Sequence, residues 1–192
     1  IFDHYDNTSY GSGYDGQDYL STNGSGSVSS RNNTGISVSE IAPGQGFFVR
    51  TKFGASGNIS FTNSMRNVNS NTFYTPDNEI IQRVKIGVED EHHNYSRVLV
   101  AFLSEATEDY DNLYDAYKLE ANPFISLKTF IDGIGEGFVI QGLSVSEKPR
   151  AVRLGLKAVH GGRYQFNLDT LENIGPDMEI YLEDLETEDM IN

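Results

Sequence analysis

The fold of this chain is worked out from residues 40–66, EIAPGQGFFVRTKFGASGNISFTNSMR. Residues 46–50 carry aromatic and β-branched side chains, which fit the pleated surface of a strand. Residues 58–63 alternate apolar and polar, so Ile59 and Phe61 share one face of a second strand. The glycine-rich segment between the two patterns permits the chain to reverse. The stretch therefore predicts a β-hairpin with one buried face.

Further strand patterns follow from residue 79 onward. Residues 95–103 include a run that is apolar on both faces, which is typical of a central strand. Ile80, Val84, Ile86 and Val88 share one face of the strand before it. Five more strands are expected at residues 124–130, 137–141, 150–156, 163–168 and 178–183. Gly161-Gly162 predicts a tight hairpin between the third and fourth of these, because primed turns need positive φ.

These patterns, with no helical period between them, predict an all-β domain. The expected architecture is an antiparallel two-sheet sandwich of jelly-roll type. Its buried core is expected to contain Phe47, Val49, Phe61, Ile86, Leu99, Ala101, Leu154, Tyr164, Phe166 and Ile180.

Three stretches of the chain carry a resemblance to a known family. They are IAPGQGFFV with ISFTNSMR at residues 41–66, LVAF with EATEDYDNLYDAYKL at residues 99–119, and MEIYLED at residues 178–184. Together they resemble the β-sandwich module that lies near the C-terminus of large cell-surface proteins exported by the bacterial type IX secretion system.

The resemblance implies a function and a location. Such a module is a non-catalytic structural part of a secreted, adhesin-like protein that takes part in cell adhesion and gliding motility. The implied partners are the outer-membrane translocon and its shuttle protein, which would contact a C-terminal sorting domain absent from this segment. The expected location is extracellular or on the cell surface. Residues 40–192 would form the module, truncated at both ends relative to the full protein.

Composition limits the ligands and the chemistry. The formal net charge of −14 argues against nucleic acid or an anionic membrane as partner, and it leaves cations as plausible ligands. Cysteine is absent, so disulfides, thiolate metal ligands and thiol nucleophiles are excluded. No apolar run approaches the length of a membrane span. A length of 192 residues suggests one domain, or one with a short appendage.

Residues 1–39 are rich in Gly, Ser, Asn, Asp and Tyr and poor in aliphatic side chains. They are expected to form a loop region that packs on the sandwich or precedes it, because such a composition buries little apolar area. Repeated tyrosines at Tyr5, Tyr10, Tyr14 and Tyr19 suggest a surface on which glycans stack. The alternative is that the four rings only hold the loop against the domain.

An acidic loop contains the strongest candidate for a metal site. Its five carboxylates are Glu105, Glu108, Asp109, Asp111 and Asp115. Several hard oxygens on an irregular loop can surround Ca²⁺, and the ion would offset their mutual repulsion. The spacing does not match an EF-hand. The alternative is a solvated acidic loop that Tyr110, Leu113 and Tyr114 anchor to the core.

Two further motifs are each open to two interpretations. Residues 89–94, EDEHHN, could bind zinc, but adjacent histidines on a strand end point to opposite faces, which favours a solvated turn. Asp169-Thr170-Leu171 resembles the acceptor for O-glycosylation in bacteria with this secretion system, with Thr170 as the modified residue. The alternative for that tripeptide is an ordinary turn after a strand.

Motifs of catalysis are missing from the sequence. There is no Gly-x-Ser-x-Gly elbow, no phosphate-binding glycine loop and no His-Glu-x-x-His pattern. We therefore expect that this protein is not an enzyme. Two alternatives stay open beside the structural module, namely a carbohydrate-binding module and an accessory domain of an exported hydrolase.

Overall fold

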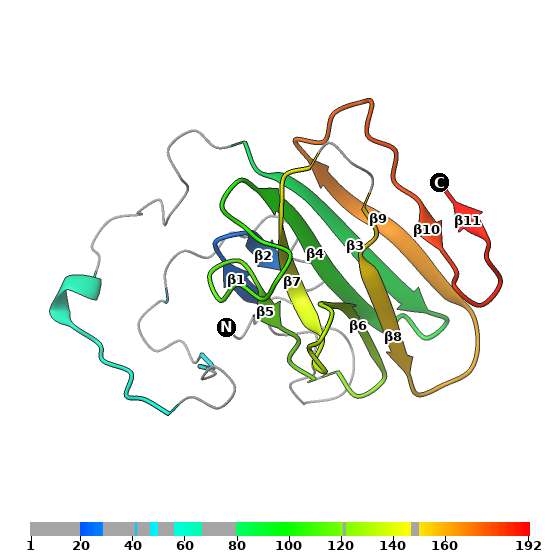
Figure 1. Ribbon diagram of the computed structural model, residues 1–192. Helices are drawn as coiled ribbons and strands as arrows, with labels where there is room; N and C mark the ends of the chain where they lie inside the picture. The colour runs from blue at the N-terminus through cyan, green and yellow to red at the C-terminus, as the bar shows by residue number, and fades with distance from the viewer. Residues whose placement is uncertain are drawn as a thin grey trace.

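The computed structural model describes residues 20–28, 41, 47–49, 56–66, 80–120, 122–146 and 150–192. Within them the chain is nearly all β (Figure 1), and the one helical element is a short 3₁₀ turn, η1 (Asn63–Met65). This confirms the predicted all-β class. No helix in the described part of the chain is long and apolar enough to cross a membrane.

Most strands belong to one seven-stranded sheet, with the order β8-β6-β7-β4-β3-β9 and with β5 paired to β7. Its strands are β3 (Gln82–Asp90), β4 (Tyr95–Leu103), β5 (Ala116–Tyr117), β6 (Ile125–Phe130), β7 (Phe138–Ser144), β8 (Arg153–Ala158) and β9 (Tyr164–Glu172). Two separate hairpins are formed by β1 (Ser21–Asn23) with β2 (Gly26–Val28) and by β10 (Leu182–Glu183) with β11 (Met190–Ile191).

Strand β4 lies between β3 and β7, which confirms the prediction of a central strand at residues 95–103. It pairs antiparallel with β3 but parallel with β7, where Leu99 lies opposite Ile140 and Ala101 opposite Gly142. The prediction of a purely antiparallel sheet is therefore wrong, because β4 and β7 run parallel. The long segment between β4 and β7 allows this, because a parallel neighbour requires a crossover connection rather than a tight turn.

The seven-stranded sheet curls into two layers. Strands β6 and β7 share one register pair, Thr129 with Phe138, and beyond it β6 and β8 lie over β4 and β3 (Figure 1). The core between the layers consists of buried Val88, Val98, Ile125 and Leu127, against which Ile86, Leu154, Leu156, Tyr164 and Phe166 pack. A sandwich thus arises from one curled sheet, in which the apolar faces of the two layers cover each other.

The opposite face of β4 is covered by other elements. Val28 of β2 packs with Leu99 and Ile140, while Tyr114 packs with Ala101. Residues 20–28, from the region expected to be a loop, therefore form a hairpin that contributes to the core. Cover on both sides explains why nearly every residue of β4 is buried.

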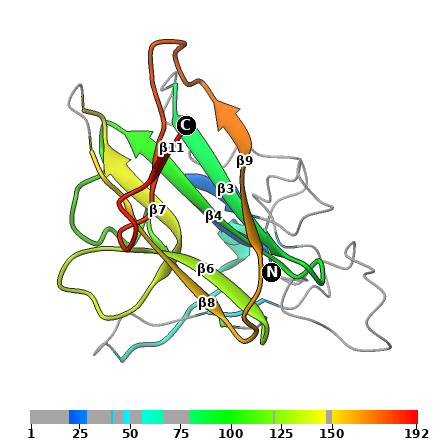
Figure 2. The ribbon, with the colours of Figure 1, turned by 90° about the vertical axis from the view of Figure 1, so that its right-hand side faces the viewer.

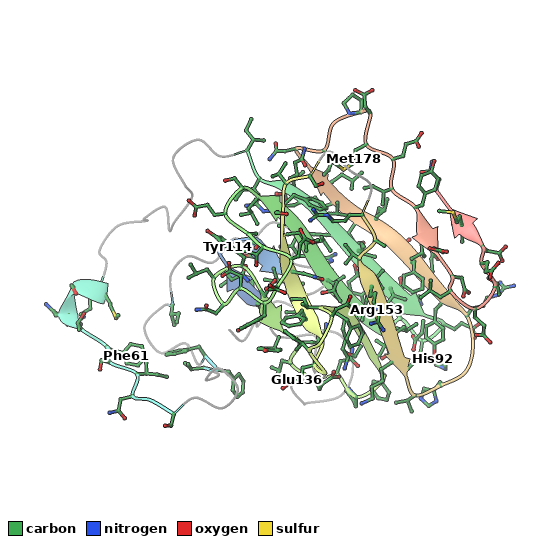
Figure 3. The ribbon with its side chains drawn as sticks, in the orientation of Figure 1. Phe61, His92, Tyr114, Glu136, Arg153 and Met178 are labelled. Atoms are coloured by element: carbon green, nitrogen blue, oxygen red, sulfur yellow. The ribbon has the colours of Figure 1, made fainter. Side chains whose placement is uncertain are left out.

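The predicted hairpin at residues 40–66 is wrong for the part that the structure describes. Residues 47–49 and 56–62 form no strand, and Phe47, Val49 and Phe61 are 39%, 54% and 70% exposed. The rings of Phe47 and Phe61 do contact each other, with centroids 5.9 Å apart, but Phe61 lies on an arm away from the sheet (Figure 3). An alternating pattern buries a face only where a partner layer covers it.

The other predicted core residues are buried or half-buried. Leu99 and Ala101 are fully buried. The remaining five, Ile86, Leu154, Tyr164, Phe166 and Ile180, are half-buried. Ile80 is 75% exposed and lies before β3, which begins at Gln82.

The predicted hairpin around Gly161-Gly162 is also wrong. Strand β8 pairs with β6 and strand β9 pairs with β3, so the two strands that flank these glycines lie at opposite ends of the sheet order. A short connection can join them because the sheet curls until its two edges approach each other (Figure 2). A glycine pair in a short loop indicates a turn but does not identify the strands that pair.

Candidate functional site

The acidic loop is fastened to the sheet by Asp115. This side chain is only 4% exposed; its Oδ1 accepts a hydrogen bond from the Gly142 backbone N at 2.9 Å. Its Oδ2 accepts a hydrogen bond from the Asp111 backbone N at 2.6 Å. Since Gly142 belongs to β7, the carboxylate connects the loop directly to the central region of the sheet.

Burial has an electrostatic consequence for this carboxylate. Removal from water raises the pKa of Asp115 to about 6 from an ordinary value of 3.8, although its two backbone hydrogen bonds act in the opposite direction. The folded state therefore holds this proton more tightly than the unfolded state does. Stability from Asp115 is fully present below pH 3.8 and is lost as the pH rises through about 6.

We expect Asp115→Asn to remove this pH dependence, because an amide does not titrate. Urea unfolding of both proteins should show that the wild type loses stability relative to the variant as the pH rises from about 4 to about 7. The comparison cancels the titration of all other groups that the two proteins share. A stability difference that is constant across this range would show that Asp115 has an ordinary pKa.

The other carboxylates of the loop face separate partners. Glu105 accepts a hydrogen bond from the Tyr114 hydroxyl at 2.9 Å, and Glu108 forms an ion pair with Arg150 at 2.9 Å. Asp111 Oδ1 accepts a hydrogen bond from the Leu113 N at 3.1 Å, whereas the Asp109 side chain is exposed.

The five carboxylates were expected to bind one calcium ion together. Among the described residues, which include the whole loop, no three His, Cys, Asp or Glu side chains form a group able to hold a metal ion. Calcium binding by Asp109, Asp111, Asp115, Glu105 and Glu108 therefore stays a prediction. A melting temperature that responds to neither calcium nor chelator would refute it.

Aromatic side chains anchor the loop, as predicted for two of three residues. Tyr114 is buried in the core (labelled in Figure 3), and the Tyr110 ring lies 5.2 Å from that of Tyr117 and 5.8 Å from that of Phe138. The prediction is wrong for Leu113, whose side chain is 63% exposed. The β1–β2 hairpin completes the attachment, because the Ser25 hydroxyl donates to the Tyr114 carbonyl at 2.7 Å and the Gly24 N donates to the Leu113 carbonyl at 3.0 Å.

The remaining predicted sites are not brought to this loop. Tyr5, Tyr10, Tyr14 and Tyr19 lie outside the described residues. Thr170 lies within β9, half-buried and opposite Lys85 of β3, so the interpretation of this tripeptide as a turn is wrong. O-glycosylation at Thr170 stays a prediction, which the intact mass of the native protein would test.

A buried charged cluster was missed by the sequence analysis. Arg97 Nε donates to Asp169 Oδ2 at 2.6 Å, and the hydroxyl of Tyr95 donates to the same oxygen. The side chains of Arg97 and Asp169 are 5% and 16% exposed. Burial, together with this carboxylate, raises the pKa of Tyr95 and keeps its hydroxyl protonated.

A β-bulge places Asp169 in this cluster. Along β3, Lys85 lies opposite Thr170 and the next residue, Ile86, lies opposite Leu168, which leaves Asp169 without an opposite residue. Such an extra residue changes the direction of a side chain. Space for it comes from Gly87, where a Cβ would lie 2.1 Å from the Tyr95 hydroxyl and 2.5 Å from Asp169 Oδ2.

A second buried polar contact joins the two layers. Lys118 Nζ donates to Ser96 Oγ at 3.0 Å, and the same oxygen accepts a hydrogen bond from the Leu127 N of β6 at 2.9 Å. Burial lowers the pKa of Lys118 to about 8. Ser96 lies on β4 and is buried, and its bond to Leu127 reaches β6. The two hydrogen bonds to Ser96 Oγ therefore fix the two layers relative to each other.

Residues 91–94 form the turn between β3 and β4, as the turn interpretation predicted, while Glu89 and Asp90 end β3. His92 and His93 are exposed, and His93 Nδ1 lies 2.6 Å from Glu89 Oε1.

One signal in the sequence pointed to the missed cluster of Arg97 and Asp169. It is Gly87, inside the β3 pattern, since a glycine within a strand often marks a close approach of other groups.

Comparisons with known proteins identify a family for this chain. No curated protein and no solved structure matches the sequence. The profile of one family, described as a domain of unknown function (DUF8693), matches residues 2–192, nearly the whole chain. The chain therefore belongs to the DUF8693 family.

Proposed function

We propose that this domain is a non-catalytic structural module of a secreted, adhesin-like protein on the cell surface, exported by the type IX secretion system. The observation that carries the proposal is that its buried polar groups connect elements of the fold to one another. Asp115, Asp169 and Lys118 each connect a loop or strand to a neighbouring strand, which is the arrangement of a stiff scaffold.

The export route is supported by the resemblance of residues 41–66, 99–119 and 178–184 to modules of such cargo proteins. The partners in this proposal are the translocon and its shuttle protein, which would contact a sorting domain outside this segment.

The jelly-roll architecture belongs to the same proposal. We assign the sandwich to the jelly-roll type, which is supported by the two curled layers that face each other across an apolar core.

A domain replacement tests the structural role. In the native bacterium, the gene segment for this domain is exchanged for an unrelated β-sandwich of similar size. Surface exposure, measured by protease accessibility, and adhesion should both persist, because a spacer requires a stable shape and no particular surface. Native protein in the cytoplasm of wild-type cells would contradict the export route.

The alternatives give different results in the same strain. Loss of adhesion with normal export would favour the carbohydrate-binding module, especially if the isolated domain binds a glycan array and Tyr5→Ala or Tyr14→Ala abolishes the signal. Loss of a hydrolytic activity with normal export would favour an accessory domain of an exported hydrolase.

A further inference from the structure

Two histidine side chains from distant parts of the chain meet at one end of the sandwich. His92 lies in the β3–β4 turn (labelled in Figure 3), and His160 lies in the connection from β8 to β9. Their ring centroids are 5.9 Å apart, and the rings are tilted by 47°. Both residues are exposed to solvent.

The backbone that carries His92 is held by its own turn. Asp90 Oδ1 accepts hydrogen bonds from the His92 N at 2.9 Å and from the Asn94 N at 2.8 Å. Asp90 Oδ2 accepts a third, from Asn94 Nδ2 at 2.8 Å. The turn is therefore fixed without help from His160.

The backbone that carries His160 is held separately. Its carbonyl accepts a hydrogen bond from the Tyr164 hydroxyl, and the preceding Val159 N donates to the Phe124 carbonyl at 3.0 Å. The His160 ring also stacks on the Phe124 ring, with centroids 6.3 Å apart. Because each backbone segment is held separately, little backbone ordering is needed to bring the pair of rings onto one ligand.

Glu91 connects the segment that carries His92 to the segment that carries His160. Its Oε1 accepts a hydrogen bond from the Arg163 N at 3.4 Å, which links the β3–β4 turn to the β8–β9 connection. Glu91 also adds a negative charge at the residue before His92, in a chain of net charge −14. Both features favour a cation at this end of the molecule.

We propose that His92 and His160 together bind one divalent transition-metal ion, with water as the remaining ligands. Each imidazole nitrogen lies about 2 Å from a bound zinc ion, so two rings on one ion have centroids roughly 5–6 Å apart, close to the separation in this structure. Imidazole selects Cu²⁺, Zn²⁺ or Ni²⁺ and not Ca²⁺ or Mg²⁺. Two protein ligands suffice because the site is open to water.

His93 provides a matched control within the same turn. Its ring pairs with Glu89 at 2.6 Å, and no ring contact with His160 connects it to the pair. His93→Ala therefore removes another exposed imidazole from the same turn and leaves the proposed site intact.

Titration calorimetry of the full chain with ZnCl₂ and with CuCl₂, at about pH 7.5, tests the proposal. One ion per chain is expected, with tighter binding of Cu²⁺ than of Zn²⁺. His92→Ala and His160→Ala should each weaken binding by at least about tenfold, and the double variant should lose little more, because either change destroys the chelate. His93→Ala should stay within about twofold of the wild type. Far-UV spectra check that every variant is folded.

Binding that survives His160→Ala, or that falls equally with His93→Ala, would overturn the proposal. In that case the contact between His92 and His160 would be a stacking interaction alone.

Discussion

Arg97→Met is expected to destabilise the domain by about 3–5 kcal/mol, since it leaves a buried carboxylate without its cation. The Arg97 side chain is 5% exposed and donates to Asp169 at 2.6 Å, so water cannot easily replace the guanidinium. Urea unfolding followed by far-UV circular dichroism measures the change.

Two controls separate the ion pair from a general effect of losing an arginine. Arg153→Met removes a partner of Asp132 at a site where the two side chains are 68% and 94% exposed, and it should cost less than about 1 kcal/mol. Arg97→Met combined with Asp169→Leu should recover much of the lost stability, because no charge is then buried alone. A single Arg97→Met variant as stable as the wild type would show that Asp169 is hydrated.

Phe138→Ala is expected to cost about 3–5 kcal/mol through the cavity that it creates. Phe138 is fully buried at the start of β7, and its ring stacks on Tyr117 with centroids 4.7 Å apart and lies 5.8 Å from the Tyr110 ring. The variant should therefore loosen the acidic loop as well as the sheet. Thermal and urea unfolding measure the loss.

Phe61→Ala is the matched control, because it removes the same side chain from a position that is 70% exposed. It should change stability by less than about 0.5 kcal/mol. A loss as large as that for Phe138→Ala would mean that residues 58–63 do belong to the core, as their alternating pattern suggested. The pair of variants thus tests both the core and the correction made to residues 40–66.

The sequence predicted strands well where alternation coincided with burial. Residues 95–103 were recognised as central because an apolar run on both faces needs cover on both faces, and β4 has it. Residues 58–63 alternate just as clearly, yet they form no strand. Alternation states which side chains share a face, and it does not state whether a second layer lies over that face.

The candidate sites were predicted less well, because ligand sets depend on contacts between distant segments. The acidic loop was located correctly, and the prediction of an exposed turn within residues 89–94 is confirmed. The sequence alone could not show that the Asp115 carboxylate faces Gly142, or that Glu108 faces Arg150. Both partners lie well beyond the loop in the chain.

The sequence by itself determined the β class, the central position of β4, most strands that follow it and the absence of thiol chemistry. These properties depend on local periodicity and composition. Only the tertiary structure decided the parallel pairing of β4 with β7, the bulge that directs Asp169 to Arg97, and the meeting of His92 with His160. All three follow from the curl of one sheet or from its strand register. That curl is selected by the burial of two apolar faces against each other, an interaction between segments that no local pattern encodes.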